Sequence, residues 1–158
     1  MIRPAGAEDA EAVARVQIES WRDAYSHLFT GEQLAGMSLT ERAAFWRRFP
    51  PLVAEVEREV VGFVAVGAAH HDDDAEGELY AIYVRPDHWG TGVGRELMEA
   101  GERRLRELGH ASAILWVFEQ NPRARRFYEA AGWKADGKEQ DAELFGMSGH
   151  VVRYAKSL

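Results

Sequence analysis

The sequence predicts a single α/β domain, residues 1–158, with a central mixed, mostly antiparallel sheet flanked by helices. Three observations predict this fold class. Two amphipathic helical patterns open the chain, three strand-like runs follow one another, and the remainder alternates strand and helix as β-α-β-α-β. No repeat, low-complexity tract or linker divides the 158 residues, and a chain of this length can bury a core without disulfides.

Helices are predicted in the first third of the chain. After a short strand near Ile2, apolar residues recur at three- and four-residue steps over residues 10–28 and form one stripe. Ser38 and Glu41 stand at the spacing of a capping box. The helix that they begin must end near Pro50, because proline disfavours helix in the residue before it.

Three strand-like runs follow. Residues 52–56 and 60–69 are rich in β-branched residues, and residues 57–59 supply a turn between them. The third run, residues 78–84, alternates between the two faces of a sheet and ends before Pro86, which cannot donate to a ladder.

The remaining chain alternates helix and strand. A glycine-rich loop opens a long helix, and residues 113–118 form the next strand. Asn121 and Pro122 then supply the N-cap and the first residue of another helix. Two last strands are predicted around Trp133 and at residues 150–154.

Composition excludes several functional classes. The chain has 26 acidic and 19 basic residues, and its net charge of −7 argues against a general nucleic-acid or anionic-membrane binder. It has no cysteine, which rules out disulfides, thiolate zinc sites and a cysteine nucleophile. The first residues lack the pattern of a signal peptide, and the longest apolar run, residues 60–69, is too short to span a bilayer. We expect a soluble, cytoplasmic protein without nucleic-acid or membrane partners.

Glycines at positions 90, 92 and 94 are the most informative local feature. They stand between a strand and a helix, where glycine allows main-chain N–H groups to turn toward one anion. The helix N-terminus adds further N–H donors, so the loop is a candidate pyrophosphate site. An ordinary tight turn that starts a helix is the alternative. A dinucleotide-binding fingerprint is excluded, because Arg95 stands where its last glycine belongs.

Residues 84–98 together with Asn121, Tyr128 and the pair Gly132-Trp133 resemble the GNAT superfamily of N-acetyltransferases. The family signature is Gln/Arg-x-x-Gly-x-Gly/Ala, followed by a helix that bears asparagine and tyrosine. Trp89 stands here at the Gln/Arg position. The detailed match covers residues 78–133, and the order of elements agrees over nearly all of the chain.

The resemblance implies acetyl-CoA as the acetyl donor and no metal. N–H groups of the loop 90–95 would hold the pyrophosphate, and the pantetheine arm would pair with the edge of the strand at residues 82–84. The N–H of Ile82 or Val84 would hold the acetyl oxygen. The residues implied to bind the cofactor are Ile82, Tyr83, Val84, Trp89, Gly90, Thr91, Gly92, Val93, Gly94, Arg95, Asn121, Arg125 and Tyr128.

The resemblance also implies two catalytic residues. Tyr128, two turns after Asn121, is the candidate acid that protonates the departing thiolate; a core aromatic is the alternative. Glu78 is the candidate base that takes a proton from the amine. It stands about 13 Å from Ile82 along a straight strand, so it would act through water or on the approaching amine. His150 is the runner-up base.

The acceptor pocket is less well defined by the sequence. Trp21 and Tyr25 are candidates to line it, although a helical aromatic stripe is more often core. Acidic residues 72–74 hint at a cationic acceptor, and with His70 and His71 they fit a solvated loop better than a metal site.

We therefore predict direct transfer of acetyl from acetyl-CoA to a primary amine, favouring a small molecule or polyamine. The alternatives are a protein N-terminus or lysine as acceptor, and a non-catalytic acyl-CoA sensor or partner-binding module. A homodimer and the acyl-chain selectivity are left open.

Overall fold

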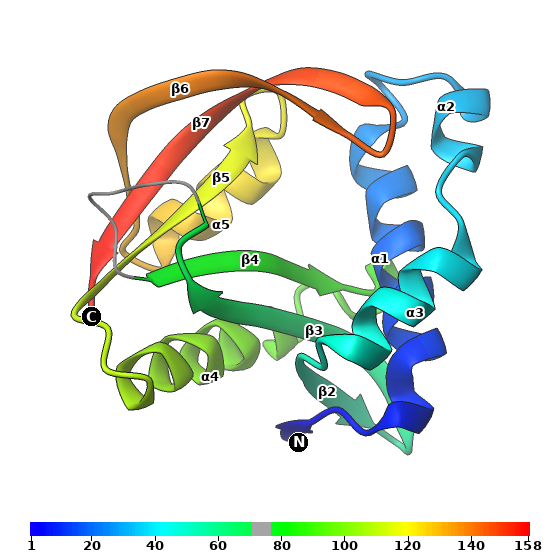
Figure 1. Ribbon diagram of the computed structural model, residues 1–158, viewed down its shortest axis with the longest axis horizontal. Helices are drawn as coiled ribbons and strands as arrows, with labels where there is room; N and C mark the ends of the chain where they lie inside the picture. The colour runs from blue at the N-terminus through cyan, green and yellow to red at the C-terminus, as the bar shows by residue number, and fades with distance from the viewer. Residues whose placement is uncertain (71–76) are drawn as a thin grey trace. The chain divides into compact units, whose positions relative to one another are not determined.

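The computed structural model describes residues 1–70 and 77–158 (Figure 1). Within them the strands form one seven-stranded sheet in the order β1-β2-β3-β4-β5-β7-β6. In chain order the elements are β1 (Ile2–Pro4), the 3₁₀ helix η1 (Ala7–Asp9), α1 (Ala10–Tyr25), α2 (Gly31–Ala35), α3 (Leu39–Arg48), β2 (Leu52–Val56), β3 (Glu59–Ala68), β4 (Gly77–Val84), the 3₁₀ helix η2 (Pro86–His88), α4 (Val93–Glu107), β5 (Ser112–Phe118), α5 (Pro122–Ala130), β6 (Lys134–Leu144) and β7 (Met147–Ser157).

The predicted fold class is confirmed. β4 and β5 pair in parallel, whereas β1 with β2, β2 with β3, β5 with β7, and β7 with β6 pair antiparallel. The order β4-α4-β5-α5-β6 reproduces the predicted second half of the chain.

The chain divides into two compact units, one of Met1–Ala65 with Ala81–Gly101 and one of Val66–Tyr80 with Glu102–Leu158. Strands β3 and β4 and helix α4 each continue from one unit into the other, so the boundaries fall inside these elements and not in a linker. The prediction of one domain over residues 1–158 stays a prediction.

The core of the first unit forms where α1 and α3 pack side by side (Figure 1). Val13 of α1 and Trp46 of α3 belong to one buried cluster with Val53 and Phe63 of the strands. The indole N–H of Trp46 donates to the Gln17 side-chain oxygen at 2.7 Å, so this buried N–H is satisfied. The apolar stripe predicted for the first helix is therefore its buried face.

The second unit contains β5, the hairpin of β6 and β7, and α5. Leu115 of β5 stands opposite Tyr154 of β7, and both side chains are buried. β6 is almost entirely exposed and pairs only with β7 in the sheet order, so it is an edge strand.

Three elements differ from the sequence prediction. The helix α2 was not predicted, and β6 runs from Lys134 to Leu144, well beyond the region around Trp133. Strand β7, Met147–Ser157, extends past both ends of the predicted residues 150–154. Among the described residues, no helix combines the length and apolarity needed to cross a membrane.

Candidate functional site

The glycine loop of the first unit contains left-handed backbone conformations. Gly90 and Gly92 have φ angles of +76° and +92°, which side chains other than glycine rarely adopt. No described protein atom lies within 4 Å of the position that a Cβ would take at either glycine. Backbone conformation and not crowding therefore requires glycine here, and the space beside the two Cα atoms is open.

Helix α4 begins directly after this loop. The N–H of Glu96 bonds the carbonyl of Gly92 at 3.1 Å, which closes the first turn. The N–H groups that precede it in the first turn have no acceptor within the helix, as at any helix start. The Thr91 hydroxyl donates to the His88 carbonyl at 2.6 Å and fixes the middle of the loop.

Trp89 connects the loop to the end of β4. Its indole N–H donates to the Val84 carbonyl at 2.8 Å, and the same carbonyl accepts from the Ser20 hydroxyl of α1 at 3.2 Å. Trp89 thus has a structural contact at the position where the family signature has Gln or Arg. The sequence did not predict this contact, because no sequence pattern indicates that a tryptophan side chain will bond a particular main-chain carbonyl.

The last residues of β4 lie in the first unit. All four residues from Ala81 to Val84 are half-buried, and Ala81 and Tyr83 pack against the buried cluster, as the predicted alternation requires. In the second unit the parallel ladder between β4 and β5 comprises two residue pairs, Gly77 with Ala113 and Glu78 with Ile114. That the main chain of residues 82–84 is free to bind a ligand stays a prediction.

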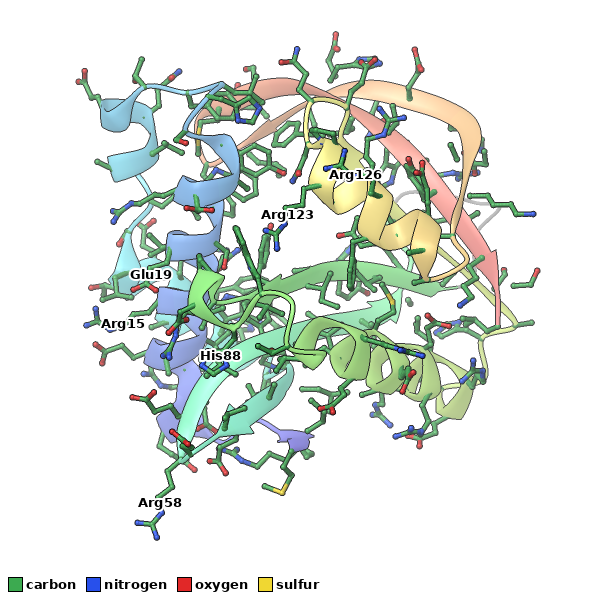
Figure 2. The ribbon with its side chains drawn as sticks, turned by 180° about the vertical axis from the view of Figure 1, so that it is seen from behind. Arg15, Glu19, Arg58, His88, Arg123 and Arg126 are labelled. Atoms are coloured by element: carbon green, nitrogen blue, oxygen red, sulfur yellow. The ribbon has the colours of Figure 1, made fainter. Side chains whose placement is uncertain are left out.

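A surface hollow of about 650 Å³ lies between α1 and the segment after β4. Figure 2 shows Glu19 of α1 beside the segment that carries His88. Arg85 forms a two-point ion pair with Asp87 at 2.7 and 3.0 Å, which lowers the pKa of the Asp87 carboxyl. The residues that line the hollow are Glu19, Arg22, Asp23, Ser26, Arg85, Pro86 and Asp87. None of them was a predicted site residue.

Tyr128 lies on α5 of the second unit and is 8% exposed. The helix starts as predicted, because the Asn121 side-chain oxygen accepts the N–H of Ala124 at 3.1 Å. The Tyr128 carbonyl accepts the N–H of Trp133 at 3.0 Å, which closes the turn after the helix. Only a small part of the Tyr128 side chain is thus exposed, as expected both for a phenol aimed into a site and for a core residue.

Two arginines that the resemblance implies to bind the cofactor have different surroundings. The Arg95 side chain is 85% exposed and lies 3.6 Å from the Glu99 carboxylate, so it is available to a ligand. Arg125 instead donates to the Tyr154 hydroxyl at 3.0 Å and to the Glu119 carbonyl at 3.2 Å. These contacts give Arg125 a structural role, and its predicted cofactor contact stays a prediction. Figure 2 shows Arg123 and Arg126 on the same helix, and both are exposed.

Glu78 has the burial expected of a base. Its side chain is 14% exposed and accepts the N–H of His70 at 3.2 Å, which leaves further lone pairs for water or an amine. Burial first, and the charge of Glu78 second, raise the pKa of the neighbouring Tyr80 phenol. Tyr80 therefore stays neutral, and its hydroxyl donates to the Ala68 carbonyl.

His150, the runner-up base, lies among three carboxylates. Its imidazole lies 2.9 Å from Asp141, 3.3 Å from Glu139 and 4.0 Å from Glu119. The hydrogen bond to Asp141 is the largest effect on the pKa of His150 and raises it; burial opposes it, and the hydrogen bond to Glu139 raises it further. The choice between Glu78 and His150 as the base stays a prediction.

Trp21 and Tyr25 are both buried in α1, with ring centroids 4.6 Å apart. Burial is consistent with a core stripe and with the wall of an acceptor pocket, so both interpretations stand. Among residues 1–70 and 77–158, no group of three histidine, aspartate or glutamate side chains is placed to hold a metal. His71 and the acidic residues 72–74 lie outside the described residues.

Comparison with known proteins identifies the family to which this geometry corresponds. Residues 11–133 match the acetyltransferase (GNAT) family. The chain is 33% identical over 134 residues to the uncharacterized N-acetyltransferase YuaI of Bacillus subtilis, covering 82% of this chain and 77% of that protein. It is 32% identical over 130 residues to an uncharacterized N-acetyltransferase of Archaeoglobus fulgidus, covering 80% and 88% of the two chains.

Partial and structural similarities agree with this assignment. A mycothiol acetyltransferase of Propionibacterium freudenreichii is 42% identical over 74 residues, which are 47% of this chain and 24% of that protein. The fold resembles the PaiA N-acetyltransferase of Thermoplasma acidophilum in complex with coenzyme A, with a TM-score of 0.75, 20% identity and coverage of 100% and 98%. It also resembles YncA of Salmonella typhimurium with acetyl-CoA, with a TM-score of 0.73, 19% identity and coverage of 99% and 92%.

Proposed function

We infer that this chain, which belongs to the acetyltransferase (GNAT) family, transfers acetyl directly from acetyl-CoA to a primary amine, with a small-molecule amine or polyamine as the favoured acceptor. Its class, an acetyl-CoA-dependent N-acetyltransferase, follows from the family. The observation that carries the proposal is the glycine loop, where two positive φ angles and open space precede the N-terminus of α4.

The loop supplies the binding function. N–H groups from Gly90 to Arg95 would hold the pyrophosphate, because glycine lets the main chain approach an anion closely and the helix dipole favours negative charge. The exposed Arg95 guanidinium adds positive charge at the same helix end. The main chain of Ile82 and Val84 would orient the acetyl group through an N–H donated to its carbonyl oxygen.

Two side chains would move protons. When bound, acetyl-CoA supplies an activated acyl group and a thiolate leaving group. Glu78 would accept a proton from the ammonium of the acceptor through a water, since an alkylamine is mostly protonated at neutral pH. As the amine nitrogen bonds the acetyl carbon and the C–S bond breaks, the Tyr128 Oη would donate a proton to the departing sulfur and regain the second proton that the nitrogen loses. Both roles rest on the resemblance and on the burial of the two side chains.

Charge supports a cationic acceptor. The chain carries a net charge of −7, and the exposed carboxylates of Glu119, Glu139 and Asp141 gather around a single imidazole. Negative charge of this kind attracts an amine with several ammonium groups. A protein N-terminus or lysine is the alternative acceptor.

Thiol release from acetyl-CoA tests the proposal across polyamines, aromatic amines, aminoglycosides and short peptides. Because the chain has no cysteine, a thiol reagent detects only the coenzyme A product. Release above the no-acceptor blank, highest with a polyamine or another small amine, is the expected result. Highest turnover with peptides would favour the protein acceptor. Acetyl-CoA binding without release on any amine would favour an acyl-CoA sensor.

A further inference from the structure

A buried phenol on β7 connects two side chains of helix α5. Tyr154 is 0% exposed. Its hydroxyl accepts from the Arg125 Nε at 3.0 Å and donates to the Glu129 carboxylate at 2.7 Å. Arg125 and Glu129 are four residues apart and thus lie on one face of the helix, one turn from each other. The Tyr154 hydroxyl therefore forms hydrogen bonds with side chains from two successive turns of α5.

The protonation states allow only one direction of hydrogen bonding. Burial foremost raises the pKa of Tyr154, so the phenol is neutral and keeps its proton. The hydrogen bond to Tyr154 foremost raises the pKa of Arg125, so the guanidinium stays charged and can only donate. The phenol must therefore accept from Arg125 and donate to Glu129. Charge-assisted bonds of this kind are directional and stronger than neutral ones.

The same arrangement places Tyr154 against the predicted acid. Tyr128 directly precedes Glu129, and its ring centroid lies 6.3 Å from that of Tyr154 with the planes tilted by 53°. The Arg125 guanidinium also donates to the Glu119 carbonyl at 3.2 Å, which ties the start of α5 to the end of β5. An apolar residue at position 154 would pack against the helix, but it would not fix how far the helix slides or rotates.

We propose that Tyr154 is a positioning residue for acetyl transfer: through Arg125 and Glu129 it fixes helix α5 and so sets the orientation of the Tyr128 hydroxyl. This inference rests on the proposed acid role of Tyr128. Tyr154 itself touches neither substrate in this scheme. A shift of a catalytic group by about 1 Å is enough to slow a reaction substantially, so the loss of this tie is measurable.

A double-mutant cycle of Tyr154→Phe and Tyr128→Phe tests the proposal. Tyr154→Phe keeps the ring and removes only the hydroxyl. We expect it to lower kcat about three- to tenfold while KM for acetyl-CoA changes less than about twofold. Tyr128→Phe is expected to lower kcat about 100-fold. In that background Tyr154→Phe should change kcat less than about twofold, because the group it positions is gone.

A second readout does not depend on turnover. The chain has five tyrosines, so the protein labelled with ¹³C at tyrosine Cζ gives few signals, and the one lost in Tyr128→Phe belongs to Tyr128. Without any ligand, Tyr154→Phe should broaden or split that signal. Asp9→Asn is the control for destabilisation alone, because it weakens an ion pair with Arg3 at 2.7 Å in the other unit. It should lower Tm but leave kcat and the Tyr128 signal unchanged.

The outcomes are distinct. Equal loss of kcat from Tyr154→Phe in both backgrounds, or an unchanged kcat in the single variant, overturns the positioning role and leaves the acid role of Tyr128 intact. Wild-type turnover in Tyr128→Phe overturns the acid role and this inference with it. Loss of kcat in Asp9→Asn that matches its loss of Tm would show that lowered stability alone explains the effect.

Discussion

His150 shows how a single residue couples charge to pH. The pKa of its imidazole is raised chiefly by Asp141, so the protonated form is stabilised in the folded protein. This contribution to stability is fully present below the unfolded pKa, near 6.5, and is lost as pH rises through the higher folded value. We expect His150→Gln to lower Tm more at about pH 5.5 than at about pH 9.

Thermal melts of His150→Gln and Asp141→Asn at several pH values check this prediction. Asp141→Asn removes the nearest carboxylate, at 2.9 Å, and should reproduce the same pH trend. A Tm difference that grows as pH rises would contradict the assignment.

Trp89 is the residue at which this chain departs from the family signature. Its N–H bond to the Val84 carbonyl ties the glycine loop to β4. Trp89→Phe keeps an aromatic ring but loses this bond, which is worth about 1 kcal/mol in a typical case. We expect KM for acetyl-CoA to rise about three- to tenfold, with kcat within about twofold.

Ser20→Ala is the matched control for Trp89→Phe. It removes the other donor to the same carbonyl, at 3.2 Å, from α1 and outside the loop. Steady-state kinetics should show a smaller change in KM for Ser20→Ala. Equal changes in KM would mean that acetyl-CoA binding depends on hydrogen bonding to the Val84 carbonyl and not on the connection between the loop and β4.

At the scale of the element, the chain contains its own control for the glycine loop. Gly92, before α4, and Gly109, after it, share a φ of +92°, and no described protein atom lies within 4 Å of the Cβ position at either. Alanine at either position costs about 1 kcal/mol of conformational strain. Only Gly92→Ala should also weaken acetyl-CoA binding, by about tenfold or more.

Calorimetric titration with acetyl-CoA and thermal melts of both variants separate the two effects. The expected result is a similar loss of Tm in both variants but an affinity loss in Gly92→Ala alone. If both variants keep wild-type affinity, the loop is an ordinary turn and the pyrophosphate site lies elsewhere.

Helices and strands that carry a cap or an apolar periodicity within their own residues were predictable from the sequence. The α5 start at Asn121-Pro122 and the β4 strand follow from a cap and an alternation that each lie within a few residues. The full length of β6 was not predictable in this way, because an edge strand exposed on both faces has no apolar period. Only its pairing with β7 determines it. For α2, the capping box of Thr30 and Gln33 was present in the sequence but was overlooked.

The candidate site likewise has features that the sequence predicts and features that depend on long-range packing. The sequence predicted a loop that uses the conformational freedom of glycine, and Gly90 and Gly92 have positive φ angles. The hydrogen bond from Arg125 to Tyr154 was not expected, because 29 residues separate the two in the sequence. Only the packing of α5 against β7 brings them together. Sequence reasoning identified the loop and the helix, whereas long-range packing decides which side chains remain available to a ligand.

At the scale of the whole molecule, the absence of cysteine determines which transfer route is simplest. No thiol among the 158 residues can hold an acetyl group, and the proposed base and acid serve a direct attack by the amine. Direct transfer requires donor and acceptor to be bound together. Initial rates measured against both substrates should therefore give intersecting and not parallel double-reciprocal lines.

Intact-protein mass spectrometry checks the same prediction independently. After incubation with acetyl-CoA and no acceptor, the protein should carry no acetyl adduct that a later addition of amine removes. Prior treatment with iodoacetamide should leave the rate unchanged, because the reagent has no cysteine to modify. A stoichiometric adduct that disappears at the rate of turnover when amine is added would instead identify a covalent intermediate on a hydroxyl or another nucleophile. Glu78 would then be expected to activate that nucleophile rather than the amine.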